Sequence, residues 1–188
     1  AYAYPLLKSY IGQRNKWSEW ELSTIDWTSL GAACNRHHAQ RHFVVKLSHD
    51  LLPTRERTKK FDSESPTHCI YCNDTDKNRD HLMRCQHEAC AKWRNNLLWT
   101  IRTRGETFQT DPVLLTILID NLHAWFNHDQ HPQLAAYPAA YRRLVSEQTH
   151  LGWRQLFNGR WSTDSSRLQT PTPGPHYNPL PTKIPRPP

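Results

Sequence analysis

Long apolar runs are absent from this sequence, and their absence excludes a membrane-spanning helix. The longest run, VLLTILI at residues 113–119, is far shorter than the roughly eighteen apolar residues that such a helix needs. Mean hydropathy is −0.82, so we predict a modest core, to which the eight tryptophans contribute. No basic segment followed by an apolar leader is present, and the chain begins AYAYPLL without Met. We therefore expect a fragment or a cleaved product with no membrane partner.

Neighbouring aspartates are also missing, which argues against polymerase chemistry in this chain. Polymerases use paired aspartates to hold two metal ions, whereas the aspartates here are scattered and no Asp-Asp pair occurs. A second enzymatic hypothesis is a nuclease of the His-Asn-His type, with a histidine general base in NRHHAQRH, residues 35–42. Its candidates are His37, His38 and His42, but partners for a second metal are loosely placed. We predict that the chain is not an enzyme.

Acidic residues are outnumbered, and the excess of positive charge favours a polyanionic partner. The formal net charge is +7, and residues 36–60 hold seven Lys and Arg against two acids, so seven minus two gives +5. Cations that neutralise phosphates give nucleic-acid affinity with strong salt dependence and little sequence preference. The predicted contacts to RNA or DNA are Arg55, Arg57, Lys59, Lys60, Tyr71, Lys77, Arg79, Arg84, Lys92 and Arg94. Tyr71 could stack on an unpaired base or be a partly exposed turn residue.

Cysteine is scarce, yet three of the five cysteines lie in CIYCNDTDKNRDHLMRC, residues 69–85. In Cys69 and Cys72, two intervening residues let a tight turn aim both sulfurs at one point, about 2.3 Å from a zinc ion. His81 and Cys85 are four residues apart, so a helix would place them one turn apart on the same face. The pattern C-x2-C-x8-H-x3-C predicts one zinc ion in a closed tetrahedral site. A closed site leaves no position for water, and its role is structural.

Residues that flank the cluster leave alternatives open. His68, His87 and Cys90 could compete as ligands, although we interpret Cys90 as a small buried apolar residue. Asp80 could accept the imidazole N–H or act as an acid in the first turn of a helix. An odd, clustered cysteine count suits a metal site in an intracellular, reducing compartment, the nucleus or the cytoplasm, better than it suits a disulfide framework. Cys34, far away in the sequence, is taken as an ordinary core residue.

Helix signals recur along the chain, and the predicted fold is mainly α. A helix is expected to begin near Ser23 or Asp26, and another covers 39–52 and ends at Pro53. Residues 54–68 are predicted to be a basic loop. A helix at 89–104, with Trp93 on its apolar stripe and in the core, is predicted to stop at Gly105. The next helix begins with Asp111 as cap and Pro112 in its first turn, and a last helix covers 137–157.

Three segments follow from these elements. Residues 1–22 form an N-terminal segment, and 23–162 form a small helical domain with the knuckle 69–85 inserted between helices. Residues 163–188 are predicted to be a Pro-rich, disordered or polyproline II tail, because 171–188 contain eight of the fourteen prolines.

Several of these motifs together resemble a known family. RHFVVKLSHDLLPTRERTKKF, CIYCNDTDKNRDHLMRC and KWR are similar to the zinc-binding region that follows the polymerase in retroelement reverse transcriptases of the non-LTR type. The segment HLGWRQLFNGRWS, residues 150–162, resembles a GW…GR segment found downstream in some of these elements. In KNRDH, Lys77 and Asn78 replace the acid and hydroxyl that the family usually has, which affects no ligand.

The resemblance implies a function and a partner. It makes Cys69, Cys72, His81 and Cys85 the zinc ligands and implies that the chain binds template RNA or target DNA. It also implies that the chain is the C-terminal part of a larger polymerase whose catalytic palm lies elsewhere. The alternative is a structural or protein-interaction zinc module with no nucleic-acid role.

Overall fold

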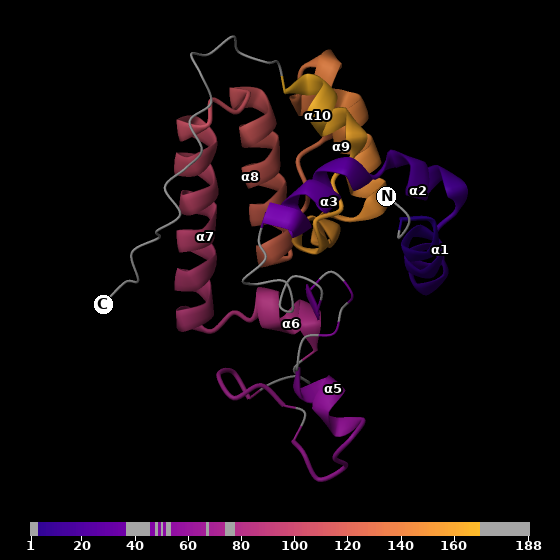
Figure 1. Cartoon of the computed structure of the whole chain (residues 1–188). Coiled ribbons are helices and arrows are strands. Elements are labelled where there is room, and N and C mark those ends of the chain that lie inside the picture. Colours follow the sequence, from indigo (N-terminus) through magenta and orange to yellow (C-terminus); the bar gives the residue numbers. More distant parts are fainter. Residues whose placement is uncertain are drawn as a thin grey trace.

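The structure is a computed structural model, and it is mainly helical (Figure 1). It describes residues 4–36, 46, 47, 49, 51, 54–66, 68–73 and 78–169. Within these ranges no strand forms, and an isolated antiparallel bridge joins Ile25 to Ser162. The predicted fold class is thus confirmed. None of the described helices has the length and apolar character needed to cross a membrane.

Two long helices, α7 (Glu88–Thr107) and α8 (Pro112–Asn127), lie side by side as a hairpin (Figure 1). The predicted start of α8 is confirmed, because the Leu114 N–H donates to the Asp111 carboxylate at 2.8 Å. The predicted stop at Gly105 is wrong, since α7 continues to Thr107. A Cβ at Gly105 would lie 2.7 Å from Leu115 Cδ1, so this glycine allows α7 and α8 to approach each other closely.

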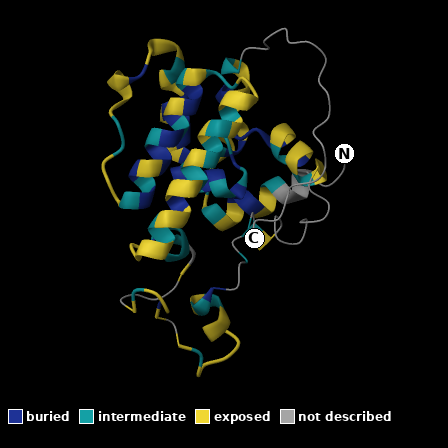
Figure 2. Cartoon of the chain, turned by 90° about the vertical axis from the view of Figure 1, so that its left-hand side faces the viewer, coloured by how far each residue is buried: buried dark blue, intermediate teal, exposed yellow. Residues whose placement is uncertain are grey.

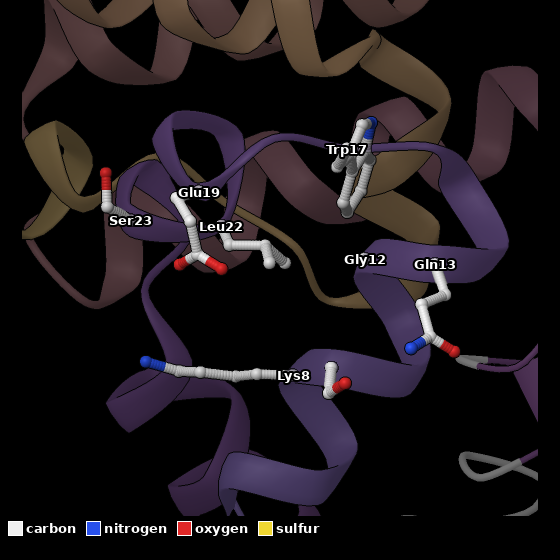
Figure 3. A pocket seen from close by; sticks show the side chains of 8 residues that line it. Lys8, Gly12, Gln13, Trp17, Glu19, Leu22 and Ser23 are labelled. Atoms are coloured by element: carbon white, nitrogen blue, oxygen red, sulfur yellow. The ribbon is translucent and has the colours of Figure 1, made fainter.

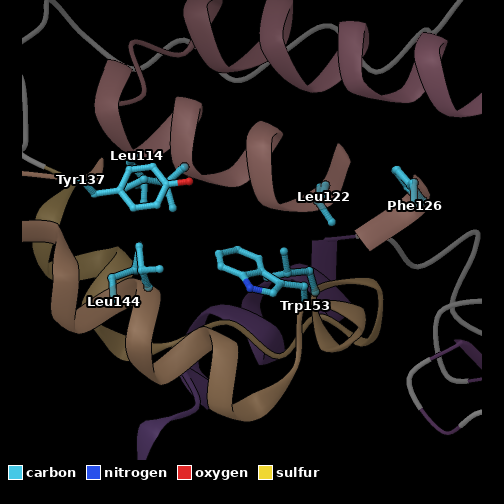
Figure 4. Packing of buried hydrophobic residues seen from close by; sticks show 9 residues of the cluster. Leu114, Leu122, Phe126, Tyr137, Leu144 and Trp153 are labelled. Atoms are coloured by element: carbon cyan, nitrogen blue, oxygen red, sulfur yellow. The ribbon is translucent and has the colours of Figure 1, made fainter. Parts of the chain in front are cut away.

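The main core lies between α8, α9 (Ala139–Leu151) and the 3-10 helix η3 (Trp153–Asn158), as Figure 4 shows. Leu122 and Phe126 of α8 meet Leu144 of α9 and Trp153 of η3 there. Tyr137, which follows the 3-10 helix η2 (Leu134–Ala136), closes the cluster. Apolar residues at helical spacing on α8 therefore supply most of one wall of the core.

The predicted single helix over 137–157 is interrupted. Gly152 has φ +91°, a conformation that an α-helix cannot contain, and its N–H caps α9 by donating to the Gln148 carbonyl at 2.9 Å. The chain then resumes as η3. The apolar periodicity continues across the break because both elements face the same core, which explains why the sequence reads as one helix.

The N-terminal residues belong to the same body. Helices α1 (Tyr4–Asn15), α2 (Glu19–Thr24) and α3 (Trp27–Arg36) form a second apolar cluster that includes Leu151 of α9. The boundary predicted between residues 22 and 23 therefore falls inside α2, and Leu22 is part of this cluster. Between α1 and α2 lies a pocket of about 480 Å³, lined by Lys8 and Glu19 among others (Figure 3).

The predicted start of α3 is confirmed at Asp26, whose carboxylate accepts the Ser29 N–H at 2.9 Å. The predicted tail begins too early, because Thr163–Leu168 form helix α10. Its N-cap Ser162 accepts the Asp164 N–H, and the Ser166 hydroxyl donates to Asp26. Tertiary contacts thus hold a segment that its composition alone placed in the tail, whereas residues 170–188 lie outside the described residues.

A smaller lobe projects below this body and contacts α7 and α8 through its last helix (Figures 1 and 2). We call residues 54–73 and 78–85 the Cys/His lobe. It contains two short helices, α5 (Arg55–Lys59) and α6 (Arg79–Arg84). The predicted loop over 54–68 thus includes a helix, which begins where the Thr54 hydroxyl accepts the Arg57 N–H. Most of the helix predicted over 39–52, with Pro53, lies outside the described residues.

Candidate metal centre

Four predicted ligands meet in the Cys/His lobe. The sulfurs of Cys69, Cys72 and Cys85 and a ring nitrogen of His81 all lie within 4.8 Å of one another. Cys69 and Cys85 are buried, at 1% and 2% exposed. All five cysteines of the chain are free thiols. The two most buried sulfurs are 3.9 Å apart, well beyond the S–S bond length of about 2.05 Å.

The spacing of these atoms fits a tetrahedral ion. Ligands about 2.3 Å from a central ion define a tetrahedron whose edge is about 3.8 Å. The Cys69 and Cys85 sulfurs are separated by 3.9 Å, which matches that edge. Cys72 Sγ lies 3.3 Å from His81 Nε2, close to the somewhat shorter edge that a nitrogen ligand gives. These two edges are close to those of a tetrahedral site, and the other four are no longer than 4.8 Å, so the cluster could hold a metal ion.

A tight turn orients the side chains of Cys69 and Cys72 toward the cluster. The carbonyl of Cys69 accepts the Asn73 N–H at 2.9 Å, which closes a tight turn around Cys72. Asn73 has φ +55°, a left-handed conformation that asparagine adopts more readily than most residues. The Tyr71 N–H points at the Cys69 sulfur, 3.5 Å away. The two-residue gap in C-x2-C thus has the geometric consequence predicted for it.

The other two ligands come from α6. Its N-cap Asn78 accepts the His81 N–H through its side chain at 2.7 Å, which fixes the first turn. Cys85 is the C-cap, and its N–H donates to the His81 carbonyl at 2.8 Å. His81 and Cys85 therefore lie one turn apart on one face, as their spacing predicts.

The two buried thiols differ in acidity. Burial opposes ionisation of Cys69, but N–H groups of Cys72 and Tyr71 and the His81 side chain donate to its sulfur and lower its pKa to about 6. Burial and the neighbouring thiols of Cys72, Cys69 and Cys90 raise the pKa of Cys85 to about 12, against the N–H of His87. A thiolate is the form that binds metals, so Cys69 is ready for coordination at neutral pH.

The three flanking candidates take other roles. His87 is the N-cap of α7 and its Nδ1 accepts the Ala89 N–H, while its ring packs on Tyr71. The carbonyl of His68 accepts a hydrogen bond from Arg55. Cys90 touches Cys85 as a partly buried thiol rather than as the fully buried residue predicted. Within the described part of the chain, the four-atom cluster includes none of the three.

Arg94 anchors the cluster to the body, a role that differs from the predicted contact with nucleic acid. Its side chain is 3% exposed, and its guanidinium donates to the carbonyls of Cys85 and Met83 at the end of α6. The same group lies over the ring of Phe126 in the core, 5.9 Å from its centroid. Arg94 cannot reach a phosphate from this position. It instead joins a metal-ligand backbone to α7 and α8.

A second anchor is the ion pair between Arg154 of η3 and Asp80 of α6, with an N–O distance of 3.2 Å. Asp80 was predicted to assist His81 or to act in the first turn of a helix. It does lie in the first turn of α6, and its carboxylate accepts a hydrogen bond from Arg154. Arg154 belongs to the GW…GR segment. That segment therefore has a structural role in this chain, with Trp153 and Arg160 buried at 4% and 1% exposed.

The other predicted nucleic-acid residues fall into two groups. Lys59, Lys60 and Lys92 are exposed, and Tyr71 is 49% exposed. Arg84 is partly buried and stacks on Trp125 at 5.2 Å, while Arg57 lies over Phe61 at 5.7 Å.

Several further predictions lie outside what the structure describes. These are Lys77, the side chain of Arg79, and the nuclease candidates His37, His38 and His42. The predicted core position of Trp93 is wrong, because this side chain is 46% exposed and meets Phe126 only edge-on.

Comparisons with known proteins give this chain no family. No family model matches it, and neither a curated protein nor a solved structure matches it. The fold and the Cys/His cluster are therefore the basis for any functional conclusion.

Proposed function

We propose that the protein is a zinc-stabilised module that binds nucleic acid. The proposal of a zinc ion rests on the cluster of three thiols and one imidazole, in which the Cys69 and Cys85 sulfurs have the separation of a tetrahedral edge. Soft thiolates with imidazole in a tetrahedral set are the preferred ligands of zinc. All four positions are filled by side chains, so the ion would stabilise the fold and supply no open position for catalysis.

The proposal that the module binds nucleic acid rests on its positive charge. The chain has a net charge of +7, and Lys59, Lys60 and Lys92 are exposed. Exposed cations gain affinity for polyanions by releasing condensed counterions. The resemblance of the LPT…C-x2-C…H-x3-C motif to retroelement reverse transcriptases supports the same proposal. On that basis the module would hold template RNA or target DNA for a larger polymerase chain.

Metal content tests the proposal of a zinc ion. Elemental analysis of the purified 188-residue chain should give one zinc per chain, and a chelator should reduce helicity in circular dichroism. Cys72→Ser should abolish zinc binding, whereas Cys90→Ser, whose thiol lies outside the ligand set, should retain it. Full zinc content in the Cys72→Ser protein would show that the ligand set is wrong.

Salt dependence tests the proposal of nucleic-acid binding. Fluorescence anisotropy with RNA and DNA probes should give log Kd against log salt with a slope of several units. Binding that is absent or insensitive to salt would favour a structural or protein-interaction module instead. That alternative is favoured by one observation, the burial of Arg94, which donates to the Cys85 carbonyl inside the structure rather than facing solvent.

A further inference from the structure

The outer face of α7 presents an unusual set of side chains. Trp99 is 67% exposed, the highest value of the eight tryptophans. Lys92, Asn95 and Arg102 are also exposed, and they lie at helical spacing on the same side as Trp99. The buried Arg94 points to the opposite side, toward the core. This stripe, which we call the Trp99 face, covers about 15 Å along the helix axis.

The chemistry of the Trp99 face suits a polyanion with flat rings better than it suits a protein. An exposed indole offers a stacking surface for an unpaired base. Lys92 and Arg102 flank it at a distance where they can contact phosphates, and Asn95 adds hydrogen-bond donors and acceptors. Tryptophan and arginine are enriched at protein interfaces as well, but lysine is depleted there, so Lys92 and the net charge of +7 favour a polyanion. Two acids, Glu88 and Glu106, lie on the same side beyond the two cations.

A pocket continues the Trp99 face at its C-terminal end. Its volume is about 450 Å³, and Arg102 belongs to both the face and the pocket. The apolar side chains of Leu115 and Ile119 contribute to its lining, together with Gln109 and Thr116, which can hydrogen-bond. Glu106 also lines the pocket and places one carboxylate beside Arg102. Apolar surface with a few polar groups is typical of sites for small planar groups. A base could enter it while its phosphate contacts Arg102.

We propose that the Trp99 face and this pocket bind single-stranded nucleic acid, with a base stacked on Trp99 and the adjacent backbone on Lys92 and Arg102. Single strands are favoured over duplexes because stacking needs a base whose face is uncovered. The inference rests on the proposed function and adds the binding surface and the form of nucleic acid. It moves the main contacts from the Cys/His lobe to α7.

The test compares binding of labelled oligouridine and of an RNA duplex of the same length to the full chain. Trp99→Ala should weaken binding of oligouridine about tenfold and leave binding of the duplex nearly unchanged. Trp99→Phe, which keeps a ring, should restore most of the affinity. Trp20→Ala is the matched control, because Trp20 is exposed, at 49%, on a different helix. Arg102→Gln should reduce the salt slope by about 0.7.

The outcomes separate this inference from the proposed function. If the wild-type chain binds RNA but Trp99→Ala binds equally well, the surface is wrong and the proposed function stands. If the wild-type chain binds no nucleic acid, both fail. A dimer that Trp99→Ala converts into a monomer would overturn the inference in favour of a second copy of the chain as the occupant. Zinc content should be unchanged in every variant, since Trp99 is not a ligand.

Discussion

The helical body and the Cys/His lobe bury different kinds of side chain. In the body, Ile117 and Phe126 are each 1% exposed, and they belong to a cluster shared by α8, α9 and η3. In the described part of the lobe, the buried apolar residues are the two cysteines Cys69 and Cys85, while Phe61 is 79% exposed. The body is thus stabilised by apolar burial. The lobe has too little of it, and the ligand cluster occupies the place where a core would be.

Metal removal should produce the largest difference in stability between the lobe and the body. We expect chelation, or His81→Ala, to unfold the lobe and loosen the start of α7, because the binding energy of structural zinc, on the order of 10 kcal/mol, is folding energy. The core amides of α8 and α9 should stay protected in hydrogen exchange. Equal loss of protection in both regions would mean that lobe and body form one cooperative unit. Cys34→Ser is the control, since Cys34 lies on α3 outside the cluster.

A cavity in the body should have the complementary effect. Trp153→Ala removes a buried side chain from the main core and should lower the free energy of unfolding by about 3–5 kcal/mol. Zinc content at neutral pH should not change. Trp99→Ala, at an exposed position, should cost less than about 0.5 kcal/mol in the same urea titration. Similar values for the two variants would contradict the described burial.

Arg94 connects the two regions, and its replacement should affect both. Arg94→Met leaves the carbonyls of Cys85 and Met83 without this donor, which should destabilise the fold by about 1–3 kcal/mol. Zinc affinity, measured by competition with a chromogenic chelator, should fall about tenfold, because the ligand backbone is less well held. Arg104→Met, an exposed change on the same helix, should alter neither quantity. Weaker RNA binding with normal zinc affinity in Arg94→Met would instead support the sequence-based prediction that Arg94 contacts nucleic acid.

The smallest expected effect concerns pH. Burial opposes ionisation of Asp26, but hydrogen bonds from Ser166 and Ser29 outweigh it and lower its pKa below the ordinary 3.8. Its carboxylate therefore stabilises the fold above that value, and the contribution is lost as pH falls through the lower folded-state pKa. Asp26→Asn should cost about 1 kcal/mol at pH 6 and progressively less as the solution is acidified. Urea titrations at several pH values measure this difference.

A carboxylate in the lobe provides the control for that experiment. Asp62 also has a lowered pKa, but its hydrogen bonds come from its own loop, Ser65 and Glu64. Asp62→Asn should therefore leave the unfolding of the body unchanged at every pH. A pH-dependent loss of body stability in Asp62→Asn would mean that the lobe is coupled to the body more tightly than the contacts made by Arg94, Arg154 and Arg84 suggest.

Predictions from local patterns succeeded where one or two turns of chain decide the outcome. Asp111 and Pro112 start α8, Asp26 caps α3, and the four ligands converge, because each depends on residues that are close in sequence. Gly105 misled the prediction because its role is to let α8 approach. The apolar periodicity across Gly152 wrongly predicted a single helix, because α9 and η3 both face the same core.

Assignments that depend on distant partners could not be made in the same way. Residues 163–168 looked like the beginning of the tail, and their helix is held by Asp26, far away in the chain. Trp93 lies on an apparent apolar stripe, but α8 covers only its edge. The position of Arg94 could have indicated its burial. It directly follows Trp93, and one face of this helix has to be buried against the core. Composition alone counted it with the exposed cations.

The sequence by itself determined that the four Cys and His side chains converge and where α3, α7 and α8 begin, because a C-x2-C turn, an i, i+4 pair and a capping residue act through nearby backbone geometry alone. The tertiary structure decided which cations face solvent. Lys92 and Arg94 are two residues apart on α7, yet the first is exposed and the second holds Cys85 against the core. Their charges are the same, and their roles differ because burial depends on which side of α7 packs against α8 and α6.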